Sequence, residues 1–174
     1  MAAAPANGGR TDWKPMDISI RQAEPADAGQ IARFAKALTD EIIKKTGTRH
    51  FNVDQEKTTA LCRELMTQGK YRVLLAFEAK SERPIGCATL CESHALYAEG
   101  TFGIIQEFYI VPEFRSQQVG ATLLERAVIE AGRLGWKRLE LCTPPLPGFE
   151  RTLSFYTDNG FEITGGRKMK RLVT

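Results

Sequence analysis

Features that mark several protein classes are absent from this sequence of 174 residues, or are rare in it. No apolar run approaches the ~20 residues of a membrane-spanning helix, so we expect no membrane partner. The 24 Lys and Arg residues nearly balance the 21 Asp and Glu residues, and a net charge of +3 gives no reason to expect a nucleic-acid partner. The two histidines and four cysteines include no Cys-x-x-Cys pair, and they predict neither a metal site nor a disulfide framework.

The rest of the composition is typical of a globular protein with one hydrophobic core. Hydrophobic residues make up 43% and charged residues 26% of the chain, close to the averages for such proteins. Residues 1–16 contain Ala, Gly and Pro but lack the apolar stretch of a secretory signal, so we interpret them as a flexible tail. Residues 17–174 are then expected to form one domain in the cytoplasm, with reduced and buried cysteines: Cys62, Cys87, Cys91 and Cys142.

The spacing of the apolar residues predicts a mixed α/β fold. Strands are expected at residues 17–21, 71–79, 85–93, 102–111 and 138–143, with a closing pair at 161–163 and 168–173. Helices are expected from Pro25 to the break at Gly47, from the capping residue Asn52 to Gly69, over residues 115–134 and over residues 150–159. The third helix has the clearest amphipathic stripe, formed by Val119, Leu123, Leu124, Ala127, Val128, Ala131 and Leu134.

The segment of residues 106–134 carries the strongest functional signal. A mostly apolar strand runs through a short polar loop into a helix, whose first free N–H groups, from about Gln118 to Ala121, form a candidate anion site. Gly120 allows a ligand to approach the backbone closely, and Arg115 adds a cation. Spacing alone fits an ordinary strand–helix connection with a solvated arginine equally well. Neither a G-x-x-x-x-G-K-[ST] loop nor a G-x-G-x-x-G motif occurs, so both of those nucleotide sites are excluded.

Two stretches of the sequence resemble the GCN5-related N-acetyltransferase (GNAT) superfamily. Residues 107–124, EFYIVPEFRSQQVGATLL, are similar to the family's strand, V-x-P-x-x-R-x-x-G-x-G/A loop and helix, and residues 154–161, SFYTDNGF, are similar to its Y-x-x-x-G-F motif. The matching residues are Ile110, Pro112, Arg115, Gly120 and Ala121, followed by Tyr156, Gly160 and Phe161. The sequence departs from the family at Gln118, where the first motif has glycine, and at Phe149, near which the family often has asparagine.

The resemblance implies a GNAT-type fold, in which helices flank a central, mostly antiparallel sheet with splayed strands. It also implies acetyl-CoA as cosubstrate and no metal. The diphosphate would rest on the N–H groups that enter the helix, and the pantetheine arm would pair with the backbone of Phe108 and Ile110. The residues implied to bind the cofactor are Phe108, Ile110, Arg115, Gln117, Gln118, Val119, Gly120, Ala121 and Tyr156.

The activity implied by the resemblance is transfer of an acetyl group to a primary amine by direct attack in a ternary complex. Tyr156 is implied to protonate the leaving thiolate, the N–H of Ile110 to serve as an oxyanion donor, and Glu107 to act as a general base. Two simpler interpretations stay open. Glu107 fits a structural ion pair, and Tyr156 fits a half-buried core aromatic.

The acceptor is specified less closely by the sequence. In the family it enters beside the first two helices and the loop before the fourth strand, which corresponds here to residues 40–52 and 94–102. Carboxylates in these segments suit a cationic amine, and basic side chains suit a carboxylate or phosphonate: Asp40, Glu41, Glu92 and Glu99 against Lys44, Lys45, Arg49 and His94. A small-molecule amine is favoured over a protein N-terminus or lysine side chain.

Other functions and partners stay open at this point. A non-catalytic acyl-CoA-binding or sensing module would use the same fold. The basic run of residues 167–171 suggests nucleic-acid binding, but an edge strand with solvated charges explains it better. A homodimer is compatible with the family resemblance.

Overall fold

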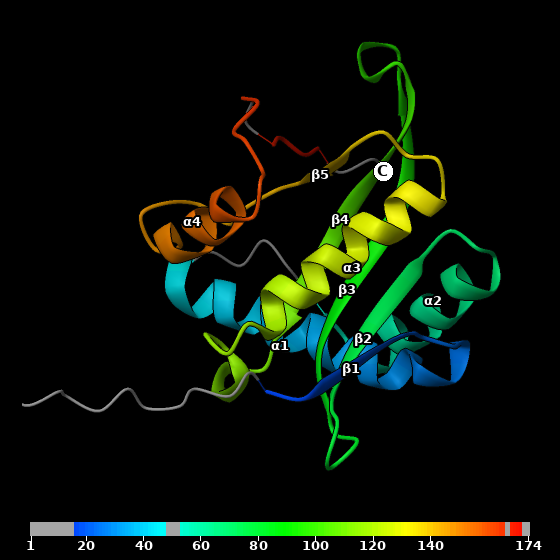
Figure 1. Ribbon diagram of the computed structural model, residues 1–174, viewed down its shortest axis with the longest axis vertical. Coiled ribbons are helices and arrows are strands. Elements are labelled where there is room, and N and C mark those ends of the chain that lie inside the picture. The colour runs from blue at the N-terminus through cyan, green and yellow to red at the C-terminus, as the bar shows by residue number, and fades with distance from the viewer. Residues whose placement is uncertain (1–15, 48–52, 166–167, 172–174) are drawn as a thin grey trace, which may run out of the picture.

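A five-stranded sheet organises the part of the chain that the structure describes. The computed structural model describes residues 16–47, 53–165 and 168–171. Within these ranges the strands are β1 (Ile18–Gln22), β2 (Arg72–Glu78), β3 (Pro84–Ala95), β4 (Gly100–Ile110) and β5 (Leu139–Leu141). The α-helices there are α1 (Ala28–Thr46), α2 (Gln55–Thr67), α3 (Val119–Arg133) and α4 (Glu150–Asp158) (Figure 1).

The strands lie in the order β1-β2-β3-β4-β5, and all neighbours are antiparallel except the parallel pair β4 and β5. β5 pairs with β4 only at Gly103, Ile104 and Ile105. Beyond Ile105 the later part of β4 therefore has a free edge on the β5 side. The mixed sheet and its flanking helices confirm the mixed α/β fold. The divergence of β4 and β5 confirms the splayed strands that the family resemblance implied.

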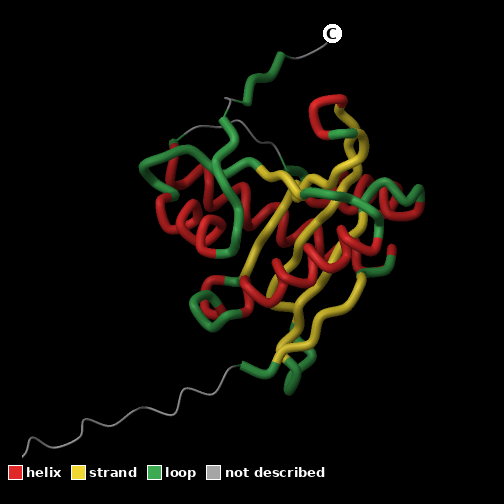
Figure 2. The backbone as a smooth tube through the Cα atoms, turned by 45° about the horizontal axis from the view of Figure 1, so that its top comes forward, coloured by secondary structure: helices red, strands yellow, loops and turns green. Residues whose placement is uncertain are grey.

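Helices cover both faces of the sheet (Figure 2). On one face α3 packs through Leu123 and Leu124, and Tyr156 of α4 joins the same core. On the other face α1 and α2 pack through side chains that include Phe34 and Cys62. Full burial of a large apolar side chain stabilises a fold by about 1.5–3 kcal/mol. The two cores therefore fix the helices against the sheet from both sides.

Local chemistry sets the ends of the first two helices. α1 ends at Gly47, whose φ of 69° is the left-handed conformation that glycine adopts most readily. α2 is capped by Asp54, whose carboxylate accepts a 2.8 Å hydrogen bond from the N–H of Lys57. The predicted cap was wrong, because the helix begins at Gln55. Asn52 itself lies outside the described residues.

Three further predictions were wrong. Val128, expected in the buried stripe of α3, is 50% exposed because it lies beyond the edge of the stripe that faces the sheet. Residues 161–165 and 168–171 form no strand, and β5 has three residues rather than six. Phe161 instead packs its ring on Tyr156, with centroids 5.7 Å apart. The apolar side chain that suggested a strand thus packs against α4. Residues 172 and 173 of the second predicted strand lie outside the described ranges.

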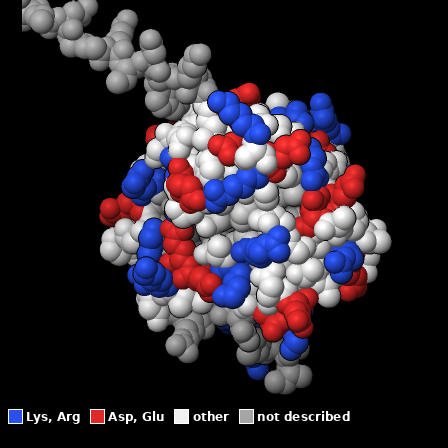
Figure 3. All heavy atoms as spheres, turned by 90° about the horizontal axis from the view of Figure 1, so that it is seen from below, with Lys and Arg blue, Asp and Glu red and all other residues white. Residues whose placement is uncertain are grey.

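Surface and cysteine features complete the description. None of the helices in the described ranges is both long and apolar enough to cross a bilayer. All four cysteines are unpaired, and Cys62 and Cys87 are buried as expected, whereas Cys91 is only partly buried and Cys142 is exposed. On the face shown in Figure 3, basic and acidic side chains are interspersed, so no large patch of one sign forms there.

Candidate functional site

A β-bulge in β4 determines which side chains face which helices. Leu90 of β3 pairs with Ile105, but Ala88 pairs with Phe108, so Thr89 alone lies opposite two residues of β4. The extra residue reverses the alternation of the strand. Phe108 and Ile110 therefore join the core under α3, whereas Glu107 lines a cleft between α1 and α2.

The main chain of β4 is open toward the gap left by β5. The N–H of Val111 donates to the carbonyl oxygen of Ile85 at 2.9 Å, so it points toward β3. Because successive residues of a strand point their polar groups to opposite sides, those of Phe108 and Ile110 point into the gap. The carbonyl of Ile110 accepts a 2.8 Å bond from Nε of Arg115. Its N–H, and both polar groups of Phe108, face the free edge.

A run of main-chain donors lies at the entrance to α3. The first bond of the helix runs from the N–H of Thr122 to the carbonyl of Gln118 at 3.0 Å. The N–H groups of residues 116–121 have no hydrogen-bond acceptor among the described residues. Ser116 and Gln118 adopt positive φ values of 61° and 64°, a geometry that turns consecutive N–H groups to one side. The N–H groups that enter α3 therefore form a donor cluster, and anion binding there stays a prediction.

At Gly120 the backbone of this donor cluster lies close to side chains of neighbouring elements. A Cβ there would come within 3.3 Å of the Phe155 ring and 3.7 Å of the Ile110 side chain. This α3 position is therefore pressed between α4 and β4, and a larger side chain would displace Phe155. Close packing against Phe155 therefore favours glycine at position 120, in addition to the predicted role of Gly120 beside a ligand.

Arg115 makes contacts that its sequence position did not predict. Its guanidinium donates to both carboxylate oxygens of Glu41 on α1, at 3.1 and 2.7 Å. Bonds from Arg115 and from Lys45 hold the pKa of the Glu41 carboxyl below its usual value. The guanidinium thus links α1 to β4 and the loop. Contact of Arg115 with a diphosphate stays a prediction.

A basic residue that the motifs did not reveal lies beside the donor run. Arg151, in the first turn of α4, donates from Nη2 to the hydroxyl oxygen of Ser116 at 3.3 Å. Its side chain is exposed, so it is free to turn toward an anion. No spacing rule points to Arg151, because it lies 35 residues from Ser116 and the fold alone brings them together. Near it, Phe149 is buried, with Nζ of Lys45 4.6 Å from its ring centroid.

Tyr156 is buried within an aromatic cluster on the α3 side of the sheet. Its ring centroid lies 6.0 Å from that of Phe108, 5.1 Å from Phe155 and 5.7 Å from Phe161. Burial raises the pKa of its hydroxyl, which therefore stays protonated at neutral pH. The described residues provide no hydrogen-bond partner for that hydroxyl. Tyr156 thus combines a core ring, as the simpler interpretation has it, with a free proton donor.

Glu107 has a different environment on the opposite face of β4. Its carboxylate accepts a hydrogen bond from the hydroxyl of Thr89, whose oxygen in turn accepts a 2.9 Å bond from the N–H of Glu107. Burial raises the pKa of Glu107, and the Thr89 hydroxyl and the charge of Lys168 oppose that rise. In the described part of the chain Glu107 forms no ion pair, so the structural ion pair considered above is not observed.

The carboxylates predicted to receive the acceptor are engaged with neighbouring side chains. Asp40 pairs with Lys36 at 2.6 Å, Glu92 accepts from Nε1 of Trp136 at 3.0 Å, and Glu99 lies 3.8 Å from Lys137. The hairpin between β3 and β4 projects beyond the body of the protein (Figure 1). Arg49 lies outside the described residues. Glu107 differs from these groups, because its carboxylate lies on the floor of the cleft between α1 and α2.

The site therefore consists of a donor-rich helix entrance beside an open strand edge, with the partly buried Glu107 on one face of that strand and the buried Tyr156 on the other. A family model for the acetyltransferase (GNAT) domain matches residues 69–163, more than half of the chain. The chain belongs to the GNAT acetyltransferase family.

Three solved acetyltransferase structures have a fold similar to that of this chain. A GCN5-related N-acetyltransferase from Ralstonia eutropha JMP134 is 17% identical, with a TM-score of 0.71 over 90% of this chain and 99% of that chain. A predicted acetyltransferase from Clostridium acetobutylicum, solved with acetyl-CoA, is 16% identical, with a TM-score of 0.71 over 89% and 96%. An aminoglycoside acetyltransferase from an uncultured soil metagenomic sample, solved with sisomicin, is 13% identical, with a TM-score of 0.64 over 90% and 95%. At these identities the likeness shows the fold alone.

Proposed function

We propose that this acetyltransferase moves the acetyl group of acetyl-CoA to a primary amine of a small molecule. The observation that carries the proposal is the run of free N–H groups at residues 116–121, which opens beside the unpaired edge of β4. A diphosphate suits the first feature, because backbone donors at a helix N-terminus favour anions. A pantetheine arm suits the second, because its amides can extend a sheet edge as an added strand does.

Three groups of the chain would then carry the chemistry. Acetyl-CoA would supply an activated thioester. Glu107 accepts a proton from the acceptor, because an alkylammonium with a pKa of ~10.4 has no lone pair to attack with. The N–H of Ile110, which points into the gap, stabilises the oxyanion that forms on the carbonyl. Tyr156 donates its proton to the departing thiolate.

The placement of the two acids on opposite faces of β4 suits this division of labour. Glu107 faces the α1 and α2 side, where the amine would arrive. Tyr156 contacts Phe108 on the α3 side, beside the edge where the thioester would lie. Orientation of both substrates can contribute ~7–11 kcal/mol to lowering the barrier, and one acid or base ~10²–10⁴ in rate.

Calorimetric titration with CoA tests the proposal directly. Gly120→Glu places bulk against Phe155 and a negative charge among the N–H donors, so we expect loss of measurable CoA binding. Gly132→Glu is the matched control, because it adds the same side chain to the same helix where a Cβ meets nothing within 4 Å. Release of free thiol from acetyl-CoA with a panel of small amines measures the reaction itself. Wild-type CoA affinity in a folded Gly120→Glu variant contradicts the proposed diphosphate site.

A further inference from the structure

A narrow cleft between α1 and α2 leads to Glu107. Its volume is about 90 Å³, well below the ~300–1,000 Å³ of sites that enclose a drug-sized ligand. Two walls are apolar, one from each helix, and the floor comes from β3 and β4: Ile31 and Ala35, Leu61 and Leu65, Thr89 and Glu107. A cleft of this size holds one thin arm of a molecule rather than a whole ring system.

The charge of the cleft has one sign. Among the described residues that line it, Glu107 has the only carboxyl group, and no Lys, Arg or His lies among them. Tyr71 and Cys62 also line it, and burial raises the pKa of the Cys62 thiol to about 11, so the thiol is neutral. Lys168 acts on Glu107 through space without lining the cleft. An ammonium group therefore meets a partner here, whereas a carboxylate or phosphonate meets none and is repelled.

The carboxylate is also held in place for such a partner. Thr89 is 1% exposed and donates to one oxygen of Glu107. Since a carboxylate has about four acceptor positions, Glu107 retains capacity for an ammonium donor. The apolar walls remove competing water, which strengthens the charge-assisted bond.

We propose that this cleft is the acceptor subsite and that the substrate is a primary amine on a slender, uncharged carbon arm, with no acidic group near the nitrogen. This inference rests on the proposed function, because it needs the thioester to lie within reach of the amine. It selects among the acceptors that the sequence left open: aliphatic or arylalkyl amines fit, and amino acids and aminoalkylphosphonates do not.

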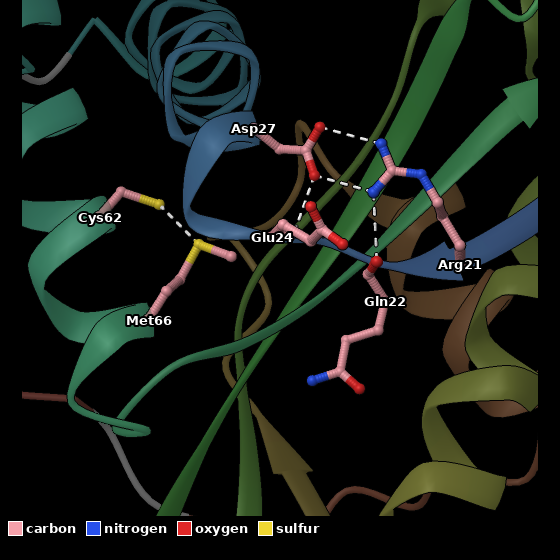
Figure 4. Close-up of polar contacts among 6 residues, drawn as sticks. All are labelled: Arg21, Gln22, Glu24, Asp27, Cys62 and Met66. Atoms are coloured by element: carbon pink, nitrogen blue, oxygen red, sulfur yellow. Dashed lines mark hydrogen bonds and ion pairs between the residues drawn. The ribbon is translucent and has the colours of Figure 1, made fainter.

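A second, larger hollow of about 350 Å³ lies next to the cleft and has different chemistry. It carries both Glu24 and Arg72, and Tyr71 lines both hollows. Cys62 and Met66, in contact through their sulfur atoms at 3.7 Å, lie on the α2 side of this region, with Glu24 across from them (Figure 4). The larger hollow does not include Glu107, so it provides a control for the role of a carboxylate.

The test compares amine acceptors that carry an added acidic group or a peptide backbone with a simple alkylamine. Thiol release from acetyl-CoA is measured with butylamine, 4-aminobutanoate, 3-aminopropylphosphonate and a dipeptide amide, while calorimetry measures CoA binding separately. We expect kcat/KM for butylamine to exceed that for each of the other three acceptors at least tenfold. Equal or greater activity with an acidic amine or the peptide overturns the inference while CoA binding and thiol release still support the proposed function. Absence of CoA binding overturns both.

Variants locate the acceptor within the cleft. Ala35→Leu and Thr58→Leu narrow it from opposite walls, and each is expected to raise KM for butylamine at least tenfold with CoA affinity unchanged. Ala60→Leu, on the exposed side of α2, and Glu24→Gln, in the larger hollow, are matched controls expected to behave as wild type. Thermal unfolding checks that each variant is folded. An unchanged KM for butylamine in either folded cleft variant, or an equal rise in the controls, overturns the inference.

Discussion

Thr89 and Glu107 are joined by two hydrogen bonds across the bulge in β4. The N–H of Glu107 donates to the Thr89 hydroxyl oxygen at 2.9 Å, and the same hydroxyl donates to the Glu107 carboxylate. The first bond satisfies a main-chain donor that the bulge removes from the regular ladder. The second orients the carboxylate toward the cleft. Thr89 therefore stabilises the bulge in β4 and also orients the carboxylate of Glu107, the candidate base.

Neutralising Glu107 should stabilise the fold at neutral pH while reducing activity. Its pKa is raised in the folded state, so the fold favours the protonated form. The stability that this shift contributes is fully present below the pKa that Glu107 has in the unfolded chain. It is lost as the pH rises through the higher pKa of Glu107 in the folded protein. Above that pH the wild type bears the cost of a buried carboxylate, which Glu107→Gln removes.

Thermal unfolding from pH 4 to pH 8 checks this prediction. We expect the melting temperature of Glu107→Gln to exceed that of wild type by on the order of 2–4 °C at pH 8, which is about 1 kcal/mol for a domain of this size. The difference should shrink toward pH 4. Glu125→Gln, exposed on α3, controls for loss of a surface charge. A Glu107→Gln variant that is less stable at every pH contradicts the argument.

Removing the hydroxyl of Tyr156 should slow the reaction without weakening CoA binding. The ring stays in its aromatic cluster, and the lost hydroxyl has no partner among the described residues. We expect Tyr156→Phe to lower kcat by ~10²–10⁴, as for loss of one general acid, with the KM for acetyl-CoA and the melting temperature nearly unchanged. Tyr97→Phe, at the exposed tip of the β3–β4 hairpin, is the control. An unchanged kcat in Tyr156→Phe excludes it as the proton donor.

Much of this site could be predicted from local sequence. The donor run at α3 follows from a strand, a polar loop and a helix in succession, and the amphipathic spacing of α3 identified its buried face except at Val128. The bulge could not be predicted in this way, because Gln106 and Glu107 fit a regular strand. It depends on Thr89, 18 residues earlier in the chain. A regular strand without the bulge would place Glu107 on the opposite face of the sheet.

Contacts across long sequence separations account for the other differences. Arg115 binds Glu41, 74 residues earlier, a contact that the sequence did not predict, and its contact with a diphosphate stays a prediction. Strands were predicted at residues 161–163 and 168–173, but the described residues there form none, and Phe161 packs against Tyr156. Local alternation shows that a side chain needs an apolar neighbour, but it does not say which element supplies that neighbour.

The pair of Glu41 and Arg115 should contribute a small, pH-dependent coupling to stability. Arg115 lowers the pKa of Glu41 in the folded state, so the stabilisation is present above the unfolded pKa of ~4.3 and is lost as the pH falls through the lower folded value. The side chains are 23% and 39% exposed, and screening by solvent limits the coupling to about 0.5–1 kcal/mol. A double-mutant cycle of Glu41→Gln and Arg115→Gln, measured by urea unfolding at pH 7 and pH 3, isolates it. A coupling as large at pH 3 as at pH 7 contradicts an ionic origin.

Replacing Gln118 by glycine should stabilise the loop that enters α3. Gln118 adopts a φ of 64°, which costs a residue with a Cβ about 1–2 kcal/mol. Glycine avoids that strain but has more unfolded-state freedom to lose, so we expect a net gain of about 0.5–1 kcal/mol. The neighbouring change Gln117→Gly is the contrast, because Gln117 lacks a positive φ and its side chain donates to the Glu113 carbonyl at 2.7 Å. Chemical unfolding should show opposite signs for the two variants, and equal destabilisation by both shows that Gln118 is not strained.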